Sequence, residues 1–197
     1  MNLLFKTLVV LIMAISFLGA CSSDDTKPIV FSVSDLRQEV HWHADFSVFI
    51  NGMQINFDEN HHITTEKFHV DEYVHIHDPF YGVVHIHREQ TSWAEFFKTL
   101  GWELSERCFI SDSEEYCSNG SDKLNFYVNG VQIDSITFLQ LSDLQRVLIS
   151  YGSQPNDLIQ ELDAVGTEAC ILSEICIDRM PETGAYPEPC SGRSSCN

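Results

Sequence analysis

The chain has 197 residues, of which 29 are Asp or Glu and 11 are Lys or Arg, so its formal net charge is −18. A surface of that sign repels nucleic acid and anionic membranes and concentrates cations, which excludes nucleic acid as a partner and favours a cation. The same charge also promotes solubility.

Residues 1–20 are expected to form an export signal. Lys6 precedes an almost wholly apolar run from Leu8 to Leu18. That run is too short for a comfortable membrane span, and small residues suited to cleavage follow it.

The end of this segment, Leu18-Gly-Ala-Cys21, resembles the lipobox of bacterial lipoproteins, whose cysteine is lipidated and becomes the mature N-terminus. Ser22 and Ser23 follow without an aspartate, which resembles Gram-negative lipoproteins of the outer membrane. We therefore expect lipidation at Cys21, a polar tether over residues 21–34, and a protein anchored in the outer membrane on its periplasmic or surface side.

Four of the nine histidines lie in two His-x-His pairs between Tyr73 and Arg88. The turn-forming run Asp78-Pro-Phe-Tyr-Gly82 separates two β-branched segments, which predicts an antiparallel hairpin. Side chains alternate along a strand, so each pair has both rings on one face and Val and Ile on the other.

A register that pairs His75 with His85 or His87 places all four imidazoles on one face. Paired Cβ atoms then lie roughly 4.5–5.5 Å apart, close enough for several rings to bind one metal ion. The alternative is a solvent-exposed patch of titrating histidines. We favour metal binding, because without a metal such rings only repel one another when protonated.

An internal repeat organises the middle of the chain. The segment Val48–Ile55 matches Phe126–Ile133, and each contains Asn-Gly between β-prone runs. Asn-Gly is typical of the type I′ turn of a β-hairpin, because both central residues need positive φ. The sequence therefore predicts two related hairpin units.

The first unit carries His41-Trp-His-Ala-Asp45 upstream of its turn, and alternation places His41, His43 and Asp45 on one face. The corresponding residues of the second unit are Asn119, Ser121 and Lys123. The hairpin scaffold therefore does not require histidine here, and we expect His41 and His43 to join the metal site.

This motif resembles the His-x-His-x-Asp-His signature of metallo-β-lactamase-like hydrolases, but Phe46 replaces the last histidine and no alternating strands and helices follow. Paired His-x-His strands are also similar to those of cupins and α-type carbonic anhydrases, although only locally.

The remaining candidates around the ligands have weaker signals. Adjacent His61 and His62 are expected to be loop residues, and His69 is left open as a member of the site. Residues that could support the ligands are Asp45, Asp78, His69 and Glu89.

Six cysteines follow Cys21, and an even number in an exported chain implies disulfides. Cys108 and Cys117 are close in sequence and are expected to pair. Three pairings remain open for the last four, which are Cys170, Cys176, Cys190 and Cys196. A cysteine metal site is disfavoured because the chain has no Cys-x-x-Cys.

Two helices are expected. Ser92-Trp-Ala-Glu95 has the form of a capping box, and the apolar stripe that follows it ends at Gly101. We expect this helix to pack on the apolar face of the histidine hairpin. A second helix is expected over residues 155–165, with Leu158, Ile159, Leu162 and Val165 on one face.

The chain resembles a group of uncharacterised exported bacterial and archaeal proteins. The resemblance is carried by His41–Asp45, Asn51-Gly52, His75–His87, Gly101-Trp102, Ile149–Gly152 and the cysteines from Cys170 to Cys196. It supports the boundaries of the predicted units and implies no particular activity.

The sequence thus predicts an α+β protein of mainly antiparallel hairpins with few short helices and a disulfide-stapled tail. Its units are a signal peptide (1–20), a tether (21–34), a histidine-rich unit with a helix (35–107), a second hairpin unit (108–152), and a helix with a cysteine-rich tail (153–197).

The predicted function is binding of a divalent transition metal, Cu(II) or Zn(II), by imidazole ligands. The expected ligands are His41, His43, His75, His77, His85 and His87. The alternative is a metal-dependent hydrolase or oxidoreductase whose His-ligated ion keeps an open coordination position.

Replacing Cys21 with Ser should abolish incorporation of a labelled fatty acid and release the protein from the membrane fraction, because the thiol is the predicted acylation site. Ser22→Ala, which leaves the cysteine in place, should still be labelled. A wild-type protein that carries no acyl chain would show the lipoprotein prediction to be wrong.

Overall fold

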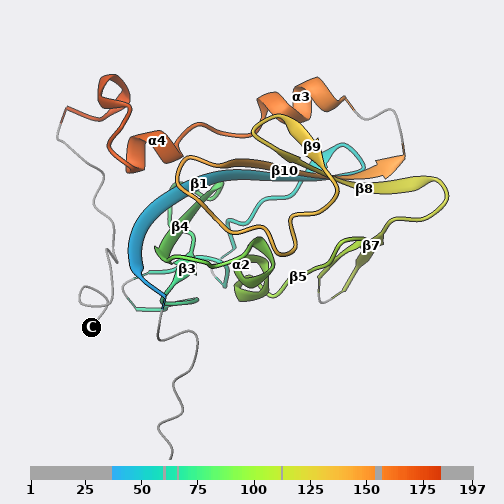
Figure 1. Ribbon diagram of the computed structural model, residues 1–197, viewed down its shortest axis with the longest axis horizontal. Coiled ribbons are helices and arrows are strands. Elements are labelled where there is room, and N and C mark those ends of the chain that lie inside the picture. Colours follow the sequence, from blue (N-terminus) through green and yellow to red (C-terminus); the bar gives the residue numbers. More distant parts are fainter. Residues whose placement is uncertain (1–36, 60, 66, 112, 154–156, 183–197) are drawn as a thin grey trace, which may run out of the picture. The chain divides into compact units, whose positions relative to one another are not determined.

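The computed structural model describes residues 37–59, 61–65, 67–111, 113–153 and 157–182 (Figure 1). Seven strands form the main sheet in the order β3-β4-β1-β10-β8-β9, with β2 paired to β1. These strands are β1 (Glu39–Ile50), β2 (Met53–Gln54), β3 (Val74–His75), β4 (Val83–Arg88), β8 (Asp122–Val128), β9 (Val131–Ile133) and β10 (Arg146–Ser153). A smaller sheet holds β5 (Glu103–Leu104), β6 (Cys108–Ile110) and β7 (Glu115–Cys117).

The helices are short: α2 (Trp93–Thr99), α3 (Leu158–Asp163), α4 (Ala169–Leu172) and the 3-10 helix η3 (Ile177–Arg179). The predicted class is confirmed, since hairpins dominate and a disulfide closes part of the tail. The parallel pairing of β1 with β10 was not predicted. β10 lies between β1 and β8, and this position joins strands of both predicted units into one sheet.

The two Asn-Gly turns are built alike, as the repeat predicts. Asn51 and Gly52 have φ of 53° and 77°, and Asn129 and Gly130 have φ of 51° and 80°. Phe49 pairs with Gln54 in the first hairpin, and the equivalent Tyr127 pairs with Gln132 in the second. β1 begins five residues earlier than β8 in the repeat, and that extra length carries His41 and His43.

Helix α2 packs on one face of the sheet and contributes Trp93, Phe96 and Phe97, all fully buried in the main core. The core also contains the Val and Ile side chains of the histidine hairpin, so α2 covers its apolar face as expected. The capping box is present: the Ser92 hydroxyl accepts from the Glu95 amide, and the Glu95 carboxylate accepts from the Ser92 amide.

Helices α3 and α4 lie on the other side of the sheet from α2 (Figure 1). Asp45 accepts hydrogen bonds from the backbone amides of Glu168 (2.9 Å) and Ala169 (3.1 Å) at the start of α4. On the neighbouring strand, Arg146 donates to the carbonyls of Val165 and Gly166. These polar contacts fix the tail over the face that carries the histidines.

Two disulfides close short loops. Cys108 bonds to Cys117 across β6 and β7, and Cys170 bonds to Cys176 after α4. Of the three pairings left open for the tail cysteines, the structure therefore contains the one that joins Cys170 to Cys176. Cys21, Cys190 and Cys196 lie outside the described residues, as does the predicted signal peptide.

Part of the second predicted helix differs from expectation. Ile159 is 74% exposed, so it does not share the buried face with Val165, while Leu158 and Leu162 are half-buried. Among the described residues, no helix is both long enough and apolar enough to cross a membrane.

Candidate metal centre

Three neighbouring strands place the predicted ligands on one face of the sheet. β1 carries His41 and His43, β4 carries His85 and His87, and the β3 segment carries His75, followed by His77. His85 pairs with His43 on one side and with His75 on the other. The hairpin therefore adopts one of the two registers that place all four of its imidazoles on one face.

The six imidazoles form a closed circuit of ring contacts. Ring centroids lie 4.7 Å apart for His43 and His85, 4.5 Å for His85 and His77, and 4.7 Å for His77 and His75. The circuit continues from His75 to His87 (5.0 Å), from His87 to His41 (5.2 Å) and from His41 to His43 (4.8 Å). We call these six residues the histidine cluster.

Most of the histidine cluster is buried. Five of its members are between 1% and 4% exposed, and only His41 is exposed to solvent. Beside it, Val83 of β4 packs against Ala169 and Leu172 of α4. A solvent-exposed histidine patch therefore does not describe this face, because five of the six rings are buried.

Backbone carbonyls fix the orientation of two rings in the cluster. His75 Nδ1 lies 2.6 Å from the Asp71 carbonyl oxygen, and His77 Nδ1 lies 3.0 Å from that of Thr64. A carbonyl oxygen only accepts, so both Nδ1 atoms carry the proton and donate it. Both Nε2 atoms then carry a lone pair, the form in which imidazole binds a metal ion.

A side-chain relay fixes a third ring. The Ser173 hydroxyl donates to Asp143 Oδ1 at 2.7 Å, so its oxygen accepts from His43 Nδ1 at 2.8 Å. Asp143 also accepts from the backbone amide of His43. The His43 ring is therefore held in the tautomer whose Nε2 carries the lone pair. Sequence reasoning missed Ser173 and Asp143, because neither stands in a recognisable pattern with His43.

Three members of the cluster are already close enough to hold an ion. His41, His43 and His85 each offer a ring nitrogen, and these ligand atoms lie within 4.8 Å of one another. A metal ion can therefore bind here after only small side-chain movements.

Burial and crowding lower the pKa of one member of the cluster. Desolvation is the main cause that holds the pKa of His75 well below its ordinary value, with further lowering by His77, His85 and His87. Beyond the cluster on the same face of β1, burial raises the pKa of Asp45 to about 6, against the opposing effect of the Ala169 amide. An unprotonated imidazole binds metal without first losing a proton.

The other predicted candidates serve the surrounding structure. Asp45 binds the backbone at the start of α4, Asp78 accepts from the Tyr81 hydroxyl in the hairpin turn, and Glu89 accepts from the Gln38 amide. His69 is exposed, and so is His61. His62 is buried and packs on Phe57, at a ring distance of 5.5 Å.

Comparisons with protein-family models, with curated proteins and with solved structures found no match.

Replacing Ser173 with Ala should release the His43 ring. In the wild type, ¹⁵N NMR of the ring nitrogens should show only the Nδ1–H tautomer of His43, and the variant should show a mixture of tautomers. Ser47→Ala is a matched control, because Ser47 donates a similar hydrogen bond from β1 to the Ala164 carbonyl at 3.2 Å.

Both substitutions should cost about 1 kcal/mol of stability, since each removes one hydrogen-bonding hydroxyl. Only Ser173→Ala should change the tautomer of His43. An unchanged His43 signal in that variant would contradict the role assigned to Ser173.

Proposed function

We propose that this chain binds a divalent transition metal ion, Cu(II) or Zn(II), through the histidine cluster. The proposal rests most directly on one pair of atoms: His75 Nε2 and His77 Nε2 lie 3.1 Å apart. Because both Nδ1 atoms donate to carbonyls, the two facing nitrogens each present a lone pair. Two lone pairs at this distance repel unless a proton or a metal ion lies between them.

A metal ion resolves that repulsion better than a proton. The buried position and the adjacent rings lower the pKa of His75, which disfavours the protonated pair. An ion with Zn–N bonds of about 2.0–2.1 Å in tetrahedral geometry holds two ligand nitrogens roughly 3.3 Å apart, close to the spacing of this pair.

The donor set supports Cu(II) or Zn(II) in particular. Imidazole suits both ions, and by the usual affinity order copper binds more tightly where both are free. Thiolate ligands do not come from the four described cysteines that are joined in disulfides. Met53 does not supply a thioether ligand to the cluster. It is 69% exposed on β2, which pairs with the end of β1 opposite to His41 and His43.

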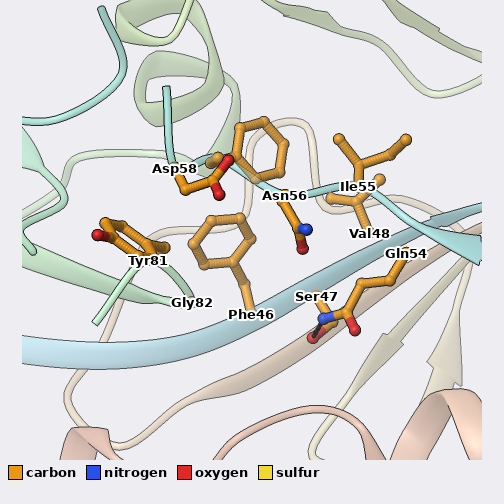
Figure 2. Close-up of a pocket in the computed structure, with 10 residues that line it drawn as sticks. Phe46, Ser47, Val48, Gln54, Ile55, Asn56, Asp58, Tyr81 and Gly82 are labelled. Atoms are coloured by element: carbon orange, nitrogen blue, oxygen red, sulfur yellow. Dashed lines mark hydrogen bonds between the residues drawn. The ribbon is translucent and has the colours of Figure 1, made fainter. Parts of the chain in front are cut away.

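The pocket that the described residues form beside β1 gives no support to the enzyme alternative. A pocket of about 200 Å³ lies beside β1, and it is lined by residues such as Phe46, Asn56, Asp58 and Tyr81 (Figure 2). None of the six cluster histidines lines it, so a substrate in this pocket would not meet the proposed ion. The carboxylates of Asp45 and Asp143 accept from backbone amides, and Asp143 also accepts from the Ser173 hydroxyl.

We further propose that the protein acts at a membrane, anchored through lipid on Cys21 and placed on the periplasmic or surface side of the outer membrane. The support is the sequence pattern at residues 18–23, together with disulfides that are typical of exported proteins. An anchored, acidic protein would hold metal cations close to that membrane.

Calorimetric titration with Cu(II) and Zn(II) tests the proposal with the double variant His75→Asn/His77→Asn. An Asn amide nitrogen can take the place of Nδ1 and keep the hydrogen bond to the carbonyl, while the Nε2 ligand is lost. We expect the affinity to fall at least 10-fold. Binding should also weaken on acidification, centred below the ordinary imidazole pKa of about 6.5, because the lowered pKa of His75 delays its protonation.

The matched control is His61→Asn/His62→Asn, which changes one exposed and one buried histidine outside the cluster. This control should bind as tightly as the wild type. Equal affinity of the His75/His77 variant and the wild type would refute the proposal.

A further inference from the structure

The histidine cluster offers more ligands than one ion uses. A tetrahedral ion takes four donors, whereas the cluster presents six imidazoles from three strands. β4 lies between β1 and β3, so the outer strands are roughly 9.5 Å apart, twice the usual strand spacing. The donors on the outer strands therefore approach β4 from opposite sides.

The first group of donors lies between β1 and β4. It contains His41, His43 and His85, whose ligand atoms lie within 4.8 Å of one another. The relay through Ser173 to Asp143 holds the His43 ring in this group. This group is open to solvent at His41, which gives an ion a path of entry.

The second group lies between β3 and β4 and is fully buried. It contains His75 and His77, whose Nε2 atoms face each other at 3.1 Å, and His87, whose ring lies 5.0 Å from that of His75. The carbonyls of Asp71 and Thr64 hold the first two rings of this group. The two groups are therefore oriented by different parts of the chain.

We propose that the cluster is a dinuclear centre, in which His41, His43 and His85 bind one divalent transition metal ion and the facing Nε2 atoms of His75 and His77 bind a second, with the His87 ring next to His75. This inference rests on the proposed function and adds to it the number of ions and the division of the ligands. The two sites are adjacent, because the His85 ring contacts the His77 ring at 4.5 Å and the His87 ring contacts the His41 ring at 5.2 Å.

Charge determines what else binds there. Two dications among six neutral imidazoles carry four positive charges in a buried site, so each ion should complete its coordination with water or hydroxide, whose pKa the metal lowers. The Asp45 carboxylate on the same face and the net charge of −18 reduce the electrostatic cost of the second ion.

The test is to load the full chain with Cu(II), remove excess metal, and measure the copper content and the electron paramagnetic resonance spectrum. The wild type should retain two Cu(II) ions per chain with a spectrum that shows magnetic interaction between them. His75→Asn/His77→Asn should retain one ion, and so should His41→Asn/His43→Asn. Each of these variants should give the spectrum of an isolated Cu(II) ion.

The outcomes separate this inference from the proposed function. A wild type that saturates at one ion would overturn the dinuclear centre and leave metal binding intact, whereas no bound ion would overturn both. Two ions without magnetic interaction would place the second outside the cluster and also overturn the inference. These three outcomes come from the unaltered chain, so they hold even where a variant fails to fold.

Discussion

The orientation of the buried imidazoles is the constraint on which this structure depends. A histidine ring can donate from one nitrogen and accept at the other, and the partner of Nδ1 decides which nitrogen does which. Here the carbonyls of Asp71 and Thr64 and the hydroxyl of Ser173 each accept a hydrogen bond from the Nδ1–H of one ring. The Nε2 atoms of these rings then carry the lone pairs, which is the form in which imidazole binds a metal ion.

The tail packs on the same face of the sheet, beside the histidine cluster. Asp45 and Arg146 lie opposite each other on paired strands, where Asp45 binds amides of the tail and Arg146 binds its carbonyls. The disulfide between Cys170 and Cys176 then encloses Ser173 in a short loop. The segment that packs beside the histidine cluster is thus also the segment that orients His43.

Local features of the sequence predicted much of the fold. The turn at residues 78–82, the two Asn-Gly turns and the capping box at Ser92 each depend on neighbouring residues, and each is present. The alternation of histidine with Val and Ile predicted which face the rings share, because a strand has a period of two. The same pattern predicted the apolar face that α2 covers.

Features that depend on distant parts of the chain were not predictable in this way. The parallel pairing of β1 with β10 joins segments about 100 residues apart, and no local pattern encodes it. The packing of Val83 against α4 is also long-range, and the hydrogen bond between His43 and Ser173 spans 130 residues. Ile159 is exposed although it belongs to the apolar stripe of α3. A stripe in the sequence identifies the apolar face of a helix, but it does not show how much of that face the sheet covers.

The central claim is that the histidine cluster holds metal in the natural protein. The most direct measurement is X-ray absorption spectroscopy of protein purified from its own cells without added metal. The spectrum should show Cu or Zn bound by nitrogen at about 2.0–2.1 Å, with the outer-shell pattern of imidazole. Protein without bound transition metal, or a shell of sulfur at about 2.3 Å, would contradict the claim.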